Sequence, residues 1–211
     1  MNGEFAAEGD LIQLITDEED DATSKEAYGE EIPILSVRNT VLFPGVVIPI
    51  TVGRQRSIRL VKKAQKGNKY IGVCSQIQPN QDDPNWEDLY QVGTLAKIIK
   101  MIVLPDGNTT IIIQGKKRFS IREQVTDDPY FIAKVDYLEE NFPKNSKKIK
   151  AMEESLKDAA TKILHLNPEI PREAQVALDN IDNTAFLTHF LSSNINAPVE
   201  SKQRLLEIND G

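Results

Sequence analysis

Short apolar segments separated by turn residues make up most of the chain between residues 32 and 138. Three β-branched and apolar runs lie at 32–37, 46–52 and 70–77. Runs of this length bounded by Gly, Pro and Asn are typical of β-strands. Pro49, inside the second run, cannot donate a backbone hydrogen bond to a neighbouring strand. We therefore expect that strand to lie at a sheet edge or to contain a bulge.

The apolar spacing changes between the second and third runs. Ile58, Val61 and Ala64 recur at intervals of three among basic residues, which predicts a short amphipathic helix over 54–66. Four further β-rich segments lie at 92–104, 109–114, 118–125 and 130–138. The turn residues Pro105–Asn108 separate the first two of these and predict a β-hairpin.

The pattern becomes helical after Asn141, and we expect four helices there. Apolar residues step at intervals of three and four, which predicts a long amphipathic helix over 146–166. The other three are expected to start near Pro171, after a cap at Asp182, and near Pro198. Their apolar stripes are Ala174, Leu178 and Ile181, then Phe186, Leu187, Phe190 and Leu191, then Leu205, Leu206 and Ile208.

These elements predict an α+β protein with two structured parts. Many short strands, one helix and no alternation of strands with helices indicate an antiparallel β-barrel over 32–141. An all-α helical bundle is expected over 142–211. Residues 1–31 hold 11 acidic residues and one lysine, a net charge of −10, and are expected to form a disordered acidic tail. The remaining 24 basic and 21 acidic residues are nearly balanced, which gives little support to nucleic-acid binding.

The chain lacks the residue groups that carry catalysis. A phosphate-binding loop needs Gly-x-x-x-x-Gly-Lys-Ser/Thr, and Gly115–Lys117 lacks the first glycine and the hydroxyl residue. Cys74 lies in an apolar run and is expected to be a buried packing residue. His165 and His189 lie far apart on predicted helices, where capping or surface positions are expected. No serine lies in a recognised nucleophile motif. We expect no catalytic, cofactor-binding or metal site.

A basic group on the predicted strands is the one candidate for a nucleic-acid surface. It consists of Lys97, Lys100, Lys116, Lys117, Arg118 and Arg122. Strand residues of opposite parity face opposite ways, Phe119 is the only aromatic residue inside the group, and the acidic residues Asp106 and Glu123 interrupt it. The simpler interpretation is a solvated, charged sheet face.

Three residue pairs within 32–54 form a distinctive pattern: Phe43-Pro44, Ile48-Pro49 and Gly53-Arg54. Matching segments follow at 92–96, 104–107, 114–119, 170–173 and 202–207. On these segments, residues 31–210 closely resemble the N-terminal domain of Lon-type ATP-dependent proteases. The resemblance implies a barrel of the PUA-like kind and a helical bundle, in front of an AAA+ ATPase module and a protease module with a Ser-Lys dyad. Both modules are absent from these residues.

The same resemblance implies that the chain binds other proteins and does not itself catalyse a reaction. The chain is expected to be a fragment that recognises unfolded, damaged or degron-bearing proteins and passes them to the absent modules, which would bind ATP and magnesium. The full-length protein would be a homohexamer. No apolar run approaches the roughly 20 residues that span a bilayer and the N-terminus is acidic, so a cytoplasmic location without membrane contact is expected.

Two alternatives remain open. One is a free-standing Lon-like adaptor that binds proteins, and the other is an RNA-binding module, because barrels of the PUA-like kind bind RNA in other families. The helical extension through Leu206 favours the protease fragment, and the scattered basic residues disfavour RNA binding.

Five residues are candidates for substrate binding: Phe43, Pro44, Arg54, Gln55 and Arg56. Arg54 and Arg56 place cations in the first turn of a predicted helix, where the dipole disfavours each by about 0.3–1 kcal/mol. Gln55 stands where many Lon relatives carry an acidic residue. An exposed Phe43 would be able to pack against an apolar segment of an unfolded chain. The simpler interpretation is that Phe43 is buried and that the arginines pair with acidic neighbours or stay solvated.

Overall fold

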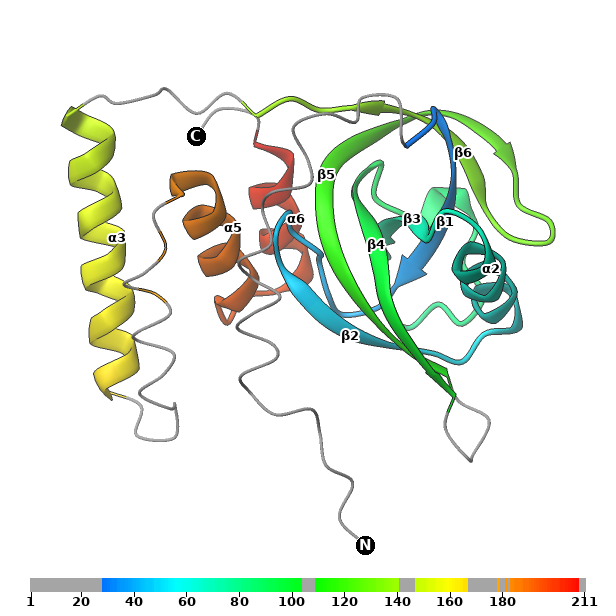
Figure 1. Ribbon diagram of the computed structural model, residues 1–211, viewed down its shortest axis with the longest axis horizontal. Helices are drawn as coiled ribbons and strands as arrows, with labels where there is room; N and C mark the ends of the chain where they lie inside the picture. The colour runs from blue at the N-terminus through cyan, green and yellow to red at the C-terminus, as the bar shows by residue number, and fades with distance from the viewer. Residues whose placement is uncertain are drawn as a thin grey trace, which may run out of the picture.

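The computed structural model describes residues 28–103, 109–140, 147–166 and 183–208, together with Leu178 and Ile181. The strands are β1 (Glu31–Val37), β2 (Val47–Val52), β3 (Tyr70–Ser75), β4 (Val92–Val103), β5 (Thr109–Thr126) and β6 (Ile132–Tyr137). The helices are α2 (Gln55–Lys66), the short 3-10 helix η1 (Trp86–Asp88), α3 (Lys147–Leu166), α5 (Thr184–Asn194) and α6 (Val199–Glu207). Figure 1 shows α6 between the strands and the other C-terminal helices.

The strands form one sheet in the order β2-β5-β4-β3-β1-β6, and β6 pairs with β5 as well as with β1. The pairings of β5, β4, β3, β1 and β6 thus form a ring that leaves β2 outside it. β1 and β3 are parallel, with Ile34 beside Gly72 and Val37 beside Ser75. The sheet is therefore mixed, and the prediction of an antiparallel barrel is wrong in this respect.

The parallel pair follows from the connection between β1 and β3. The chain leaves β1, forms β2 and passes through α2 before it enters β3. Parallel neighbours need such a crossover, because a tight hairpin would reverse the chain. Leu60, Val61 and Ala64 of α2 are buried in one core cluster with Leu35 of β1 and Ile71 of β3. The sequence predicted α2 correctly but not that it connects parallel strands.

β5 is one continuous strand, although the sequence predicts two strands in this region. Gly115 lies between the two predicted strands, and a Cβ atom there would lie 2.2 Å from the carbonyl oxygen of Phe43. Two hydrogen bonds of 2.9 Å hold this close approach: Gly45 N–H donates to the Gly115 carbonyl, and Gly115 N–H donates to the Val46 carbonyl. Glycine is thus required for the segment before β2 to lie against β5.

The predicted edge position of Pro49 is confirmed. Among the described strands, β2 pairs only with β5, and Pro49 lies opposite Ile112. Because the Val46 carbonyl faces β5, alternation directs the backbone groups of Ile48 and Ile50 toward β5 and those of Pro49 away from it. The missing N–H of Pro49 therefore lies on the free edge, where it costs no ladder hydrogen bond.

The C-terminal helices do not confirm a separate bundle. The predicted helix that begins at Pro171 falls mostly on residues outside the described ones. Leu187 of α5 packs with Leu178, Ile181 and Ala160 in a small cluster, but Leu206 of α6 is buried among residues of the segment before β2. The last helix thus belongs to the core of the sheet. The cap of α5 is Asn183, whose side chain accepts from the Phe186 N–H at 3.0 Å, and not Asp182 as predicted.

A buried arginine joins the helices to the sheet. Arg118 of β5 is only 2% exposed, and it donates to the Leu206 carbonyl at 2.8 Å and to the Ile208 carbonyl. Its Nε lies 3.2 Å from Glu140 Oε1, an ion-pair distance without hydrogen-bond geometry. Glu140 in turn hydrogen-bonds His189 Nε2 of α5 at 2.8 Å. Arg118 therefore does not belong to a solvated basic face, and His189 is buried, not a capping or surface residue.

The structured part of the chain begins before the predicted end of the acidic tail. Tyr28 packs edge-on against Tyr70, with ring centroids 4.9 Å apart, and Glu30 lies 2.9 Å from Arg122. Glu31 is already part of β1. Residues 1–27 lie outside the described residues, so the prediction of disorder for them stays a prediction.

Replacing Gly115 with alanine should destabilise the fold, because the added Cβ would meet the Phe43 backbone. We expect Gly115→Ala to lower the free energy of unfolding by roughly 1–3 kcal/mol, the usual cost of overpacking. Gly53→Ala is the matched control, since a Cβ there has no atom within 4 Å. Urea unfolding followed by circular dichroism measures both variants, and equal stabilities would contradict the close approach.

The pKa of Glu140 should make stability depend on acidity. Burial raises this pKa, but the His189 hydrogen bond and the Arg118 charge outweigh burial and hold it below the usual 4.5. A lowered carboxylate pKa stabilises the fold above pH 4.5, and this stabilisation is lost as pH falls through the folded-state value. Glu140→Gln should therefore cost about 1–3 kcal/mol at pH 7 and progressively less in acid. Unfolding measured from pH 7 to pH 3 tests this, with the exposed Glu154→Gln as a control that shows no such trend.

Candidate functional site

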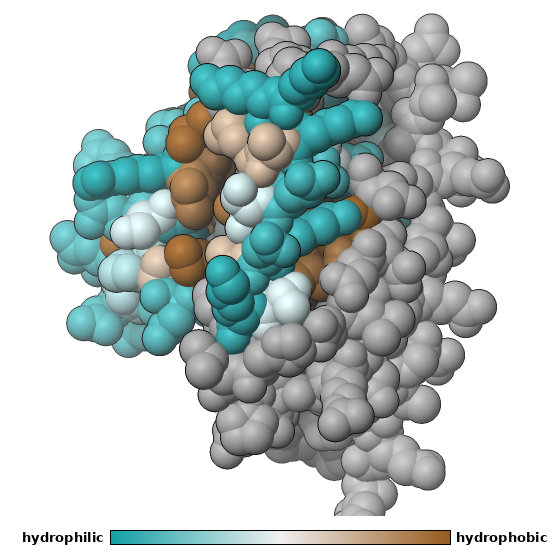
Figure 2. All heavy atoms as spheres, turned by 90° about the vertical axis from the view of Figure 1, so that its left-hand side faces the viewer, coloured by the Kyte–Doolittle hydropathy of each residue, from teal (hydrophilic) through white to brown (hydrophobic). Residues whose placement is uncertain are grey.

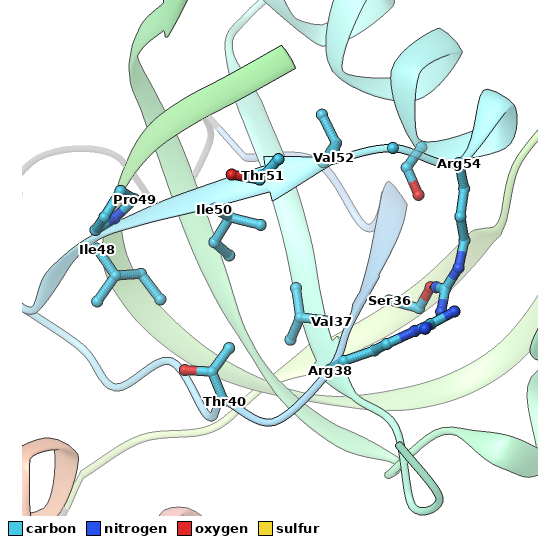
Figure 3. A pocket seen from close by; sticks show the side chains of 12 residues that line it. Ser36, Val37, Arg38, Thr40, Ile48, Pro49, Ile50, Thr51, Val52 and Arg54 are labelled. Atoms are coloured by element: carbon cyan, nitrogen blue, oxygen red, sulfur yellow. The ribbon is translucent and has the colours of Figure 1, made fainter. Parts of the chain in front are cut away.

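A groove of about 750 Å³ lies between the end of β1 and the free edge of β2. One wall consists of residues 36–38 and Thr40, and the other of residues 48–54 together with Ser57 at the start of α2. Figure 3 shows these side chains around the opening. The groove is lined by apolar side chains, hydroxyl groups and two arginines.

The groove exists because, within the part of the chain that the structure describes, neither strand on its two sides has a partner there. β6 pairs with residues 31–33 of β1, and β3 occupies the other edge of β1 from residue 34 to residue 37. On one edge of β1, the Val37 carbonyl accepts from the N–H of Gln76, just after β3. On the other edge, the Ile34 N–H donates to the carbonyl of Phe131, just before β6. The backbone groups of Val37 and Ile34 therefore point in opposite directions. Alternation then directs the backbone N–H and C=O of Ser36 toward the groove.

The floor of the groove is apolar. Ile48 and Ile50 of β2 and Val37 of β1 point toward one another in Figure 3. Val37 belongs to the main core cluster, and Ile48 and Ile50 pack against that cluster while remaining partly accessible. Pro49 and Thr51 alternate with them and are exposed. An apolar side chain entering the groove would therefore reach the edge of the protein core.

Arg54 forms one end of the groove. Its guanidinium donates to Ser36 Oγ at 2.9 Å, to Gln76 Oε1 at 2.6 Å and to the Gln81 carbonyl at 3.3 Å. These acceptors are neutral. Burial, followed by the charge of Arg38, lowers the pKa of Arg54. The hydrogen bonds thus compensate for the unfavourable position of a cation at the start of α2. Because the acceptors are neutral, they do not neutralise the charge of Arg54.

The other predicted arginine lies outside the lining of the groove. Arg56 has its guanidinium 4.7 Å from the centre of the Phe131 ring, within 3.4 Å of the Pro84 carbonyl and 3.8 Å from Asp83. Gln55 is exposed at the first position of α2. The sequence missed Arg38, which lines the groove beside Arg54 and pairs with the exposed Asp82 at 2.8 Å.

Phe43 cannot contact a substrate in this structure. It is 0% exposed, packs with Val41, Val46 and Leu206, and has its ring centre 5.9 Å from that of His189. Pro44 is also buried, and it lines a different hollow of about 370 Å³ beside Lys116 and Glu140. The five predicted residues therefore do not form one site. The alternation of Ile48 and Ile50 along an edge strand was the sequence signal for the groove floor.

Within the described residues, the free thiol is buried and the metal-ligating residue types do not cluster. Cys74 is a buried packing residue as predicted, and burial raises the pKa of its thiol to about 12. Within the described ranges, no group of three potential metal ligands was found. No helix in the same ranges is long and apolar enough to cross a membrane.

The sequence profile of the ATP-dependent protease La (LON) substrate-binding domain matches residues 31–211. The chain belongs to this family. It is 58% identical over 202 residues to the Lon protease of Cytophaga hutchinsonii, covering 95% of this chain and 25% of that protein. The Lon protease of Flavobacterium johnsoniae is 45% identical, over 98% of this chain and 25% of its own length. The chain thus spans about a quarter of these relatives.

Solved Lon structures share the fold of the chain. The N-terminal domain of Mycobacterium avium complex Lon protease superposes with a TM-score of 0.66 at 19% identity, covering 84% of this chain and 90% of that one. The Lon N-terminal domain protein from Xanthomonas campestris gives 0.61 at 18% identity, covering 85% and 91%. The mixed sheet with its C-terminal helices is therefore the fold of Lon N-terminal domains.

Replacing Arg54 should loosen the wall of the groove. We expect Arg54→Leu to lower the free energy of unfolding by about 1.5–3 kcal/mol, as for hydrogen bonds to a charged group. Amide hydrogen exchange should rise between residues 76 and 84, because the Gln76 and Gln81 contacts are lost. Arg59→Leu, at an exposed position of the same helix, is the control. Unchanged exchange in Arg54→Leu would show that these contacts do not hold the segment.

Proposed function

We propose that this domain recognises unfolded, damaged or degron-bearing polypeptides for a Lon-type protease of which it is a part. The observation that carries the proposal is the match of the LON substrate-binding domain over residues 31–211. The groove supports it, because an apolar floor beside strand edges suits an extended chain more than a folded protein.

The chemistry of proteolysis belongs, in this proposal, to the rest of the longer protein. An AAA+ module there would bind ATP and magnesium, and a Ser-Lys dyad would cleave the substrate. The protein would act in the cytoplasm. The similarity to relatives about four times longer favours this arrangement over a free-standing adaptor.

Assembly into a homohexamer is part of the same proposal. Figure 2 shows apolar side chains between hydrophilic ones on the helical side of the molecule. Met152 and Leu156 of α3 are 55% and 44% exposed. Ala160, on the same apolar stripe of α3, packs instead against the cluster that contains Leu187. Exposed apolar residues such as Met152 and Leu156 suit contacts within an oligomer.

RNA binding has less support. Arg118, at the centre of the basic group, is buried against backbone carbonyls, and Arg122 pairs with Glu30 and Asp136 at 2.9 Å each. Two of the six cations in that group are thus already engaged by carbonyl or carboxylate groups, which weakens the case for a phosphate-binding surface.

A binding experiment with the purified chain tests the proposal. A disulfide-bonded protein would be labelled and compared with its reduced, carboxymethylated form by fluorescence anisotropy. We expect the unfolded form to bind and the native form to bind at least about tenfold more weakly, since only the former exposes extended apolar segments. Neither casein nor ATP should be hydrolysed. Equal binding of both forms, or tighter binding of single-stranded RNA, would overturn the proposal.

A further inference from the structure

We infer that the groove between β1 and β2 binds one extended segment of a polypeptide as an added strand, with a carboxylate of that segment at the Arg38–Arg54 end. This inference rests on the proposed function and specifies the mode of recognition. It commits to an unfolded polypeptide as the occupant, in preference to a second copy of this chain.

The backbone of both walls is oriented for strand addition. On β2 the groups of Val47, Pro49 and Thr51 point away from β5, because those of the intervening residues face it. On β1 the groups of Ser36 point toward the same space. An extended segment between the walls can therefore hydrogen-bond on both of its edges, as in other cases of strand addition.

The side chains of the walls fit alternating residues of such a segment. In an added strand, every second side chain would point to the apolar floor formed by Val37, Ile48 and Ile50. The other side chains would face solvent beside Pro49 and Thr51. Recognition would depend on apolar residues at alternate positions and tolerate varied sequences between them.

The positive charge of the groove lining favours a bound segment that carries a carboxylate. The twelve lining residues include Arg38 and Arg54 and no aspartate or glutamate. Asp82, which pairs with Arg38 at 2.8 Å, lies outside this lining and has a side chain that is 93% exposed. A carboxylate of the bound segment would complement these cations. It could be the C-terminal carboxylate of the polypeptide or an acidic side chain.

Pro49 makes the free edge of β2 better suited to binding a short segment than to permanent pairing with another strand. It removes one donor from the middle of the edge, and edge prolines disfavour continuous pairing between identical strands. The edge keeps the donors of Val47 and Thr51. This arrangement permits a short guest strand and discourages edge-to-edge association of two copies.

Backbone-methylated peptides test the strand mode. The probe is a labelled peptide of about eight residues with alternating Val and Ser and a free C-terminus, titrated with the whole chain. N-methylation of alternate residues, in either phase, should weaken binding by about tenfold or more, because one edge loses its donors. Unchanged affinity after methylation, or no binding of the parent peptide, would overturn the inference.

Two variants locate the site. Ile50→Asp places a charge on the apolar floor of the groove and should abolish peptide binding. Gln124→Asp places the same charge at an exposed position of β5 outside the groove lining and should change affinity by less than about threefold. Circular dichroism confirms that both variants fold. If Ile50→Asp still bound the peptide as tightly as the unmodified chain, the groove would not be the site. Binding of the carboxymethylated protein would then show separately whether the proposed function holds.

Amidated peptides test the carboxylate. C-terminal amidation should weaken binding to the unmodified chain by about fivefold or more, and Arg38→Gln should remove this difference. An amidated peptide with glutamate at its last position separates the two sources: recovered affinity assigns a side-chain carboxylate, and unrecovered affinity assigns the C-terminus. Equal binding of acid and amide peptides would overturn the assignment of a carboxylate.

Discussion

The arrangement of the sheet depends on one edge of β5, which is shared by two strands in succession. β2 pairs with residues 109–114 of this strand, and β6 pairs with residues 119–126. Because β6 also pairs with the start of β1, the rest of β1 continues past β6 without a partner strand on that side among the described residues. β2 and the end of β1 therefore face each other across a space. The groove thus results from the way in which β2 and β6 share the backbone hydrogen bonds along this edge of β5.

The division occurs at Gly115. Its close approach to the Phe43 backbone brings the segment before β2 across β5. That segment is also held by Thr94 Oγ1, which donates to the Leu42 carbonyl at 2.6 Å. Phe43 thereby enters a core cluster with Leu206 of α6. The same contact thus sets the position of β2 and attaches the last helix to the sheet, so the helices are not independent of the strands.

Three arginines show how position decides the role of one residue type. Arg118 is buried and holds the last helix through backbone carbonyls, whereas Arg122, four residues further along β5, forms exposed ion pairs. Such exposed pairs contribute little to stability. Arg54 is intermediate, because neutral acceptors hold it in the groove wall and leave its charge available.

The sequence by itself determined the local structure and the family. Apolar periodicity gave α2 and α3, and Pro49 marked an edge strand, because these features depend on neighbouring residues alone. The tertiary structure decided which strands became neighbours, and with that the parallel β1–β3 pair, the burial of Phe43 and Arg118, and the groove. Each of these depends on contacts between residues far apart in the chain. Phe43 has the same sequence environment whether it is exposed or buried, and its place was fixed by Gly115, which lies in a strand 72 positions later.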